Sequence, residues 1–308
     1  MLSRVADSLY WMARYLERAE HTARIIGVQM NLMLEQGSVT EAERWERILQ
    51  SLGDPEIDGT SRDAGALTRA LLFDAECDAS IHALINTARE NSRQVRNQIS
   101  SEMWEQLNRL YHAVRRASSD RMAQPLDYMV KVDLGVHLFH GITDSTMSHN
   151  EGWQFIQIGR YLERATNTAQ LLDVHFRHTP GEGYLEWVGL LRSCTAFEAY
   201  CREYTADVRP GRLADFLLLD SDFPHSIRFS LERVHSALRS LPGSEHMGSR
   251  ATRLAGRSQS TLRYLQIDEI LASGMHDQLE DIRLQCGQIH SAFQESYIDY
   301  SIEAALTA

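Results

Sequence analysis

Glutamate and arginine occur together at two places in this chain, at a spacing that could do chemistry. The segment RYLERA at residues 14–19 is repeated unchanged at residues 160–165, which is 146 residues further on. The first arginine of each copy lies three residues before the glutamate, so in a helix the two side chains are neighbours. Carboxylate and guanidinium groups so placed can pair with each other or bind a carboxylate ligand. The charged members of this candidate site are Arg14, Glu17, Arg18, Arg160, Glu163 and Arg164.

A second charged stretch, ARENSRQVR at residues 88–96, has a similar pattern. Its candidate residues are Arg89, Glu90, Asn91, Arg93 and Arg96. The three arginines would line one edge of a helix, which suggests bonds from Arg89 or Arg93 to Glu17 or Glu163 on another helix. Two alternatives stay open: a solvated face of salt bridges, or a pocket for a carboxylate or phosphate if the arginines are partly buried and unfilled.

The simplest interpretation of each Glu-Arg motif is a helix surface with interleaved charges, where a pair contributes a few tenths of a kcal/mol. The identical recurrence of six residues favours a shared constraint instead. That constraint is either packing between two parts of the chain or a ligand site, and the motif does not decide between them.

Metal and cofactor motifs are weak in this sequence. Asp133, His137 and His140 share one helical face, but histidines at helical spacing are more often hydrogen-bonded or exposed than bound to metal. A di-iron bundle needs two Glu-x-x-His pairs, and only Glu232 and His235 have that spacing. The sequence contains no HExxH, Walker or GxGxxG motif, so we predict neither a metal nor a cofactor.

The elements that must position these residues are helices. Apolar and small residues alternate at spacings of four and three along the first stretch: Val5, Leu9, Met12, Leu16, Ala19, Ala23, Ile26, Met30 and Met33. The same periodicity holds over residues 155–176 and 81–99, and the six prolines fall between such stretches, where helices start or end. Asp74 and Asp220, with the Ser and Pro residues after Asp220, are typical of helix caps. We predict an all-α protein of ten to twelve helices.

Internal matches indicate a tandem duplication. Besides the hexapeptide, residues 71–81 resemble residues 217–227 at the same offset of 146, and residues 45–51 resemble residues 187–193. Only a short turn, GITDSTMSHNEGW, separates the copies. We therefore predict two tandem pseudo-repeated units, residues 1–147 and 148–308, packed into one multi-helix bundle.

Charge and composition narrow the class of protein. The chain has 308 residues, 43% of them hydrophobic, and a formal net charge of −11, which argues against binding to nucleic acid or an anionic membrane. No apolar stretch is long enough to span a membrane, and the N-terminus has no signal-peptide pattern. Four cysteines without a CxxC pair suit a reduced compartment, so we expect a cytoplasmic protein.

Five segments together resemble the bacterial alpha-E family, an all-helical family with Glu-Arg motifs. These segments are residues 2–24, 88–100, 151–173, 190–200 and 216–227, and the resemblance extends over essentially the whole chain. One departure is His225, where the family pattern usually has an arginine after Phe-Pro, so an anion-binding role for that position does not carry over.

The resemblance implies partners more than an activity. Genes of this family tend to lie beside, or be fused to, genes for a circularly permuted ATP-grasp protein and a transglutaminase-like protein. That implies a non-catalytic helical partner or scaffold for ATP-dependent amide-bond formation on a peptide or amino acid. The alternatives are an enzyme that binds and activates a peptide or amino-acid carboxylate through buried Glu and Arg groups, and a structural homo-oligomer.

Overall fold

Fourteen helices and no strand make up the described part of the chain. The computed structural model describes residues 1–34, 40–57, 63–119, 124–178, 183–242 and 249–298. The helices are α1 (Ser3–Leu34), α2 (Glu41–Ser51), α3 (Ala64–Phe73), α4 (Ile81–Gln94), α5 (Ser101–Ser119), α6 (Pro125–Thr146), α7 (Glu151–His178), α8 (Tyr184–Ser193), α9 (Phe197–Tyr204), α10 (Pro210–Leu219), α11 (Ile227–Arg239), α12 (Arg250–Tyr264), α13 (Ile267–Ser273) and α14 (Met275–Tyr297). The all-α prediction is confirmed. The predicted number of helices was too low, because α9 and α13, with 8 and 7 residues, are too short to show a clear period.

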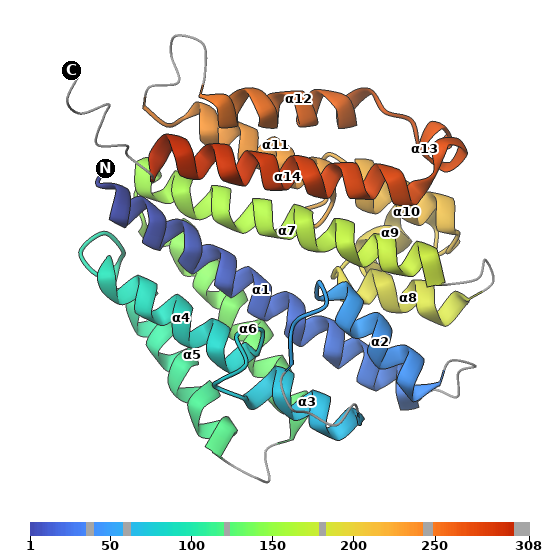
Figure 1. Ribbon diagram of the computed structural model, residues 1–308, viewed down its shortest axis with the longest axis horizontal. Coiled ribbons are helices and arrows are strands. Elements are labelled where there is room, and N and C mark those ends of the chain that lie inside the picture. Colours follow the sequence, from blue (N-terminus) through green and yellow to red (C-terminus); the bar gives the residue numbers. More distant parts are fainter. Residues whose placement is uncertain (35–39, 58–62, 120–123, 179–182, 243–248, 299–308) are drawn as a thin grey trace.

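Two long helices, α1 and α7, run side by side through the middle of the molecule (Figure 1). On one side α4 and α6 pack on α1, and α5 packs on both of them. On the other side α11 and α14 pack on α7, and α12 packs on both of those. The bundle is thus two groups of four helices that meet along the α1–α7 contact. The division into units at residue 147 stays a prediction.

Capping residues explain where several helices begin. Pro125 and Pro210 occupy the first turns of α6 and α10, where the backbone N–H that proline lacks would have no partner within the helix. The Ser80 hydroxyl accepts a hydrogen bond from a backbone N–H at the start of α4, and Ser226 does the same for α11. Asp220 does not cap α11 as predicted: it follows the end of α10, and its carboxylate accepts from two N–H groups of the turn.

The same local structure recurs at the offset found in the sequence. Helices α3 and α10 start 146 residues apart, and so do α4 and α11. In both places the capping serine also donates to the carbonyl oxygen of an aspartate six residues earlier, Asp74 or Asp220. Origin by duplication remains a prediction from the sequence.

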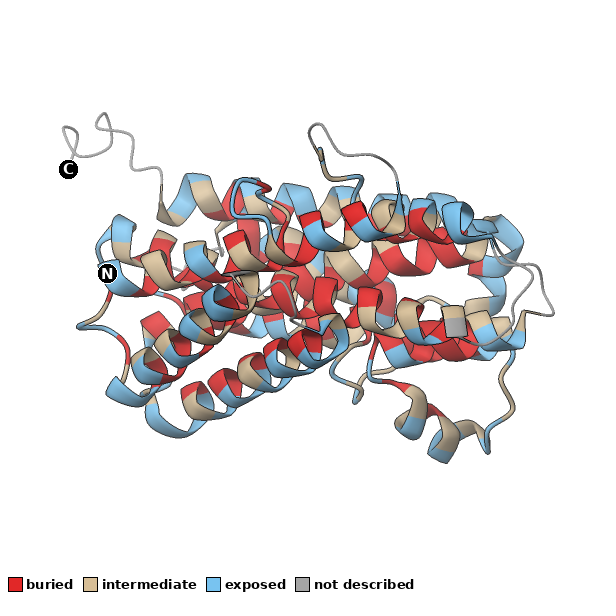
Figure 2. Ribbon diagram, turned by 90° about the horizontal axis from the view of Figure 1, so that it is seen from below, coloured by how far each residue is buried: buried red, intermediate tan, exposed pale blue. Residues whose placement is uncertain are grey.

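The predicted apolar seam of α1 lies in the core (Figure 2). Leu9, Met12 and Leu16 are fully buried there. The α1 and α7 backbones come so close that a Cβ at position 159 would overlap the carbonyl oxygen of Tyr10, and only glycine fits. This close contact brings the charged flanks of the two helices together.

Candidate site: a buried charge network between two central helices

The two copies of the RYLERA motif face each other across the α1–α7 contact. Leu16 and Leu162 lie in the core, and the charged residues of both copies flank them. Five of the six charged side chains are largely shielded from solvent, and that of Arg18 is the most exposed at 38%. The motif is therefore a contact between the two central helices.

Glu163 of α7 is held by two arginines of α1. Arg14 Nε donates to one carboxylate oxygen at 2.5 Å and Arg18 Nε to the other at 2.7 Å. Burial alone would raise the pKa of Glu163, but the charges of Arg14 and Arg18 outweigh it and hold the pKa at about 2. Glu163 is thus a permanent anion at neutral pH. Arg14 also donates to the Tyr10 hydroxyl at 3.0 Å, which fixes its guanidinium.

Glu17 of α1 is held in the reciprocal way by α7. Arg164 donates to both carboxylate oxygens, from Nε at 2.5 Å and from Nη2 at 2.9 Å, which is a bidentate pair. Arg160 lies further off, with Nε 3.8 Å from Glu17 Oε2. Each glutamate is therefore bound by the arginines of the opposite copy, as in an interface with two-fold symmetry.

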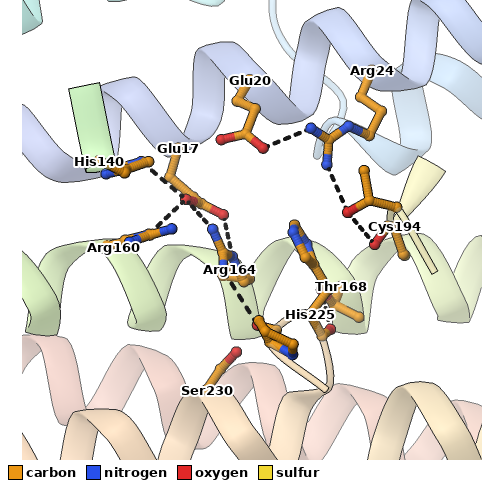
Figure 3. A network of polar contacts seen from close by, with 12 residues as sticks. Glu17, Glu20, Arg24, His140, Arg160, Arg164, Thr168, Cys194, His225 and Ser230 are labelled. Atoms are coloured by element: carbon orange, nitrogen blue, oxygen red, sulfur yellow. Dashed lines mark hydrogen bonds and ion pairs between the residues drawn. The ribbon is translucent and has the colours of Figure 1, made fainter. Parts of the chain in front are cut away.

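The network continues along α1 and onto α6. Arg24 donates to Glu20 at 2.7 Å and to Asp133, and His137 of α6 lies 3.2 Å from Glu20. Burial would raise the pKa of Glu20, but the hydrogen bond with His137 and the charge of Arg24 hold it well below its ordinary value. The same hydrogen bond raises the pKa of His137. Figure 3 shows that Glu20 lies between Arg24 and Glu17.

His140, one turn after His137, points at Glu17 from α6 (Figure 3). Its Nε2 atom is 3.9 Å from Glu17 Oε2, too far for a hydrogen bond. Burial lowers the pKa of His140 well below its ordinary value, and the positive charge of Arg160 lowers it further. The imidazole is therefore neutral.

The second charged motif lies elsewhere, and its arginines form local salt bridges, as in the alternative of a solvated face, and do not pair with Glu17 or Glu163. Arg89 donates to Asn108 on α5 at 2.7 Å, and both Arg89 and Arg93 pair with Glu90 at 2.8 Å. Arg96 lies over the ring of Trp104. Asn91 lies on the same helix and is partly buried. The motif joins α4 to α5 and covers a partly solvated face, because α4 turns this edge away from α7.

Glu20 and Arg24 are the members of the network that sequence reasoning missed. With Glu17 they follow the spacing i, i+3, i+7, which places all three on one side of a helix. That signal was available in the sequence. What the sequence did not indicate was that this side of α1 faces Asp133 and His137 on α6.

A small polar cavity lies beside the network. Its volume is about 10 Å³, room for about one water molecule. Four of its lining residues each have a buried polar atom without a hydrogen-bond partner among the described residues: Glu20 Oε2, His21 Nε2, Asn167 Nδ2 and Ser193 Oγ. The cavity can hold a water that satisfies them, and it is too small for an amino acid.

The fold and this network define an all-helical bundle whose two central helices exchange Glu–Arg pairs. Residues 1–298 match a family described as a predicted alpha-helical domain with a conserved ER motif. The chain belongs to this family, Alpha-E.

Two curated relatives come from mycobacteria. An uncharacterized protein of Mycobacterium bovis is 26% identical over 307 residues, covering 91% of this chain and 34% of its own length. An uncharacterized protein of Mycobacterium tuberculosis is 25% identical over 307 residues, again covering 91% of this chain and 34% of its own length. The chain thus spans about a third of the length of the relatives it matches. No solved structure matches it.

Among the described helices, none combines the length and the apolar character required to cross a bilayer.

Proposed function

We propose that this chain is a non-catalytic helical partner, or scaffold, of an ATP-grasp enzyme that forms amide bonds on a peptide or amino acid in the cytoplasm. The observation that carries the proposal is a row of apolar side chains on the outer face of α6. Leu126, Val130, Leu134 and Leu138 follow one another at intervals of four residues, and all four are exposed.

The opposite face of α6 already packs on α1 and α5. A helix with two apolar faces is usually buried on both faces. A contiguous row of exposed apolar side chains therefore marks an interaction surface. Leu134, in the middle of the row, exposes 62% of its surface. A protein partner that covers this row would remove these side chains from water.

The relatives support a role beside other protein. In the two mycobacterial proteins the matching region is 34% of the chain, so it is part of a much longer polypeptide. A domain that elsewhere is covalently joined to other protein is a good candidate for a stable complex. The family resemblance supports an ATP-grasp protein, and a transglutaminase-like protein as a further member.

The alternative, an enzyme that binds a substrate carboxylate through the Glu-Arg motifs, has less support. Arg14 and Arg164 already bind Glu163 and Glu17 at 2.5 Å. A substrate carboxylate would have to displace one of these buried glutamates, and the neighbouring cavity has room for about one water.

Co-purification with an ATP-grasp protein of the kind that the family resemblance implies tests the proposal. We expect a stable complex and a higher rate of ATP-dependent ligation when this chain is present. Leu134→Asp should abolish the complex, because it places a charge in the middle of the apolar row. Leu284→Asp is the matched control, since Leu284 on α14 is 60% exposed and outside the row, and it should leave the complex intact.

Two results would overturn the proposal. One is that the wild-type proteins do not associate and the ligase rate is the same with and without this chain. The other is that light scattering shows a homodimer that Leu134→Asp converts to a monomer, which would assign the row to self-association.

A further inference from the structure

We propose that Glu17, Glu20 and His140 form a binding site for a divalent transition-metal ion. The inference is independent of the proposed partner role, because a metal here can be structural in a scaffold. Each of the three residues offers one ligand atom, and these atoms all lie within 4.8 Å of one another. Two helices supply them: Glu17 and Glu20 are three residues apart on α1, and His140 approaches from α6 (Figure 3).

Two of the candidate ligand atoms have no partner. Glu20 Oε2 and His140 Nε2 are buried and make no hydrogen bond within the described chain. Glu20 and His140 are only 2% and 4% exposed, so bulk water cannot compensate. Leaving a buried polar atom unsatisfied is unfavourable, so each of these two atoms is open to a ligand.

A neighbouring cluster shows why the inner one is the candidate. Glu20, Asp133 and His137 also bring ligand atoms within 4.8 Å of one another. There, however, the Arg24 guanidinium donates to both Glu20 and Asp133 and so occupies the cation position. In the inner cluster Arg164 binds Glu17 alone and does not bridge it to Glu20, and Arg160 Nε stays 3.8 Å from Glu17 without a hydrogen-bond partner among the described residues.

The donor set selects the class of metal. Two carboxylates and one neutral imidazole suit Zn²⁺, Mn²⁺, Fe²⁺ or Co²⁺, and three protein ligands leave a position for water. His140 Nε2 has no hydrogen-bond partner among the described residues, so this ring nitrogen is available to a metal. Arg24, Arg160 and Arg164 lie near the carboxylates and repel a cation, so binding should be weaker than at a site without them.

The opposite side of the α1–α7 contact provides an internal comparison. The residues 146 positions after Glu17, Glu20 and His140 are Glu163, Thr166 and Cys286. There Thr166 hydrogen-bonds to the Cys286 thiol, so a neutral pair replaces the Glu–His pair. Glu163 is fully engaged by Arg14 and Arg18. On the Glu17 side, by contrast, Glu20 Oε2 and His140 Nε2 are without a partner among the described residues.

Metal titration of the full-length chain tests the proposal. The protein is stripped with EDTA and titrated with Zn²⁺ by calorimetry and with Co²⁺ by visible absorption, and bound zinc is counted by elemental analysis after gel filtration. We expect about one ion per chain for wild type. His140→Gln and Glu20→Gln should each weaken binding about tenfold or more, since each removes a ligand.

Glu163→Gln is the matched control, because it removes an equally buried carboxylate on the side without free ligand atoms. It should keep the wild-type stoichiometry and affinity. His140→Gln replaces one neutral group by another, so it keeps the test valid if the Glu20 variant fails to fold, as circular dichroism would show.

Three results would overturn the inference. The first is wild-type protein that retains no zinc after gel filtration. The second is equal binding by wild type and both ligand variants. The third is a high-resolution crystal structure grown with Zn²⁺ that has an ordered water only between Glu17, Glu20 and His140.

Discussion

Replacing Glu163 by glutamine measures how much the crossed ion pairs stabilise the fold. Glutamine has the shape of the protonated carboxyl but lacks its charge. The pKa of Glu163 is about 2 in the folded chain, against 4.5 for an unperturbed carboxyl, and each pKa unit is worth about 1.4 kcal/mol. We therefore expect Glu163→Gln to lower the free energy of unfolding by about 3 kcal/mol at pH 7.

The loss of stability caused by Glu163→Gln should depend on pH. Because folding lowers the pKa of Glu163, its ionisation stabilises the fold above about pH 4.5 and the stabilisation is lost as the pH falls toward 2. The difference between wild type and Glu163→Gln should therefore shrink over that range. Urea denaturation followed by circular dichroism at several pH values measures it.

Glu90→Gln is the control, because Glu90 also pairs with two arginines, both at 2.8 Å. Its side chain is 39% exposed, so its loss should cost less than about 1 kcal/mol. If Glu163→Gln were as mild as Glu90→Gln, or if its effect did not shrink in acid, the buried network would not stabilise the fold as argued.

Three further predictions address separate features of the bundle. Gly159→Ala should lower the free energy of unfolding by about 1–3 kcal/mol, since its Cβ would overlap the Tyr10 carbonyl oxygen. Gly141→Ala, whose Cβ would meet nothing within 4 Å, should be neutral or stabilising in the same urea titration. Burial lowers the pKa of His21 to about 4, so the fold should lose stability as the pH falls from about 6.5 to 4, and His21→Asn should reduce that loss. Ser80→Ala should cost about 1 kcal/mol by removing a helix cap, and an unchanged melting temperature would contradict this.

Periodicity alone was enough to predict the helices and their buried faces. Leu9, Met12 and Leu16 are core residues because a spacing of three and four identifies one side of a helix whatever it packs against. The two short helices α9 and α13 were not predicted, because 7 or 8 residues form only about two turns and show no clear periodicity.

The partners of the charged residues could not be predicted in the same way. The sequence identifies Glu17 and Glu163 as flanking residues, but the spacing of a motif says nothing about which helix lies opposite. For Arg89 and Arg93 the spacing therefore left Glu17, Glu163 and a salt-bridged face as alternatives, and the structure pairs both with Glu90. Packing between helices, which the structure has, was one of the two explanations that the motif left open.

The exchange of ion pairs between α1 and α7 has a consequence for how this chain can change over generations. A substitution that removes Glu17 leaves the almost fully buried Arg164 without its counter-ion. The harm is relieved only by a second change, more than a hundred residues away in the gene. The substitutions that one half of the chain tolerates therefore depend on the residues present in the other half, and we expect the two halves to change together.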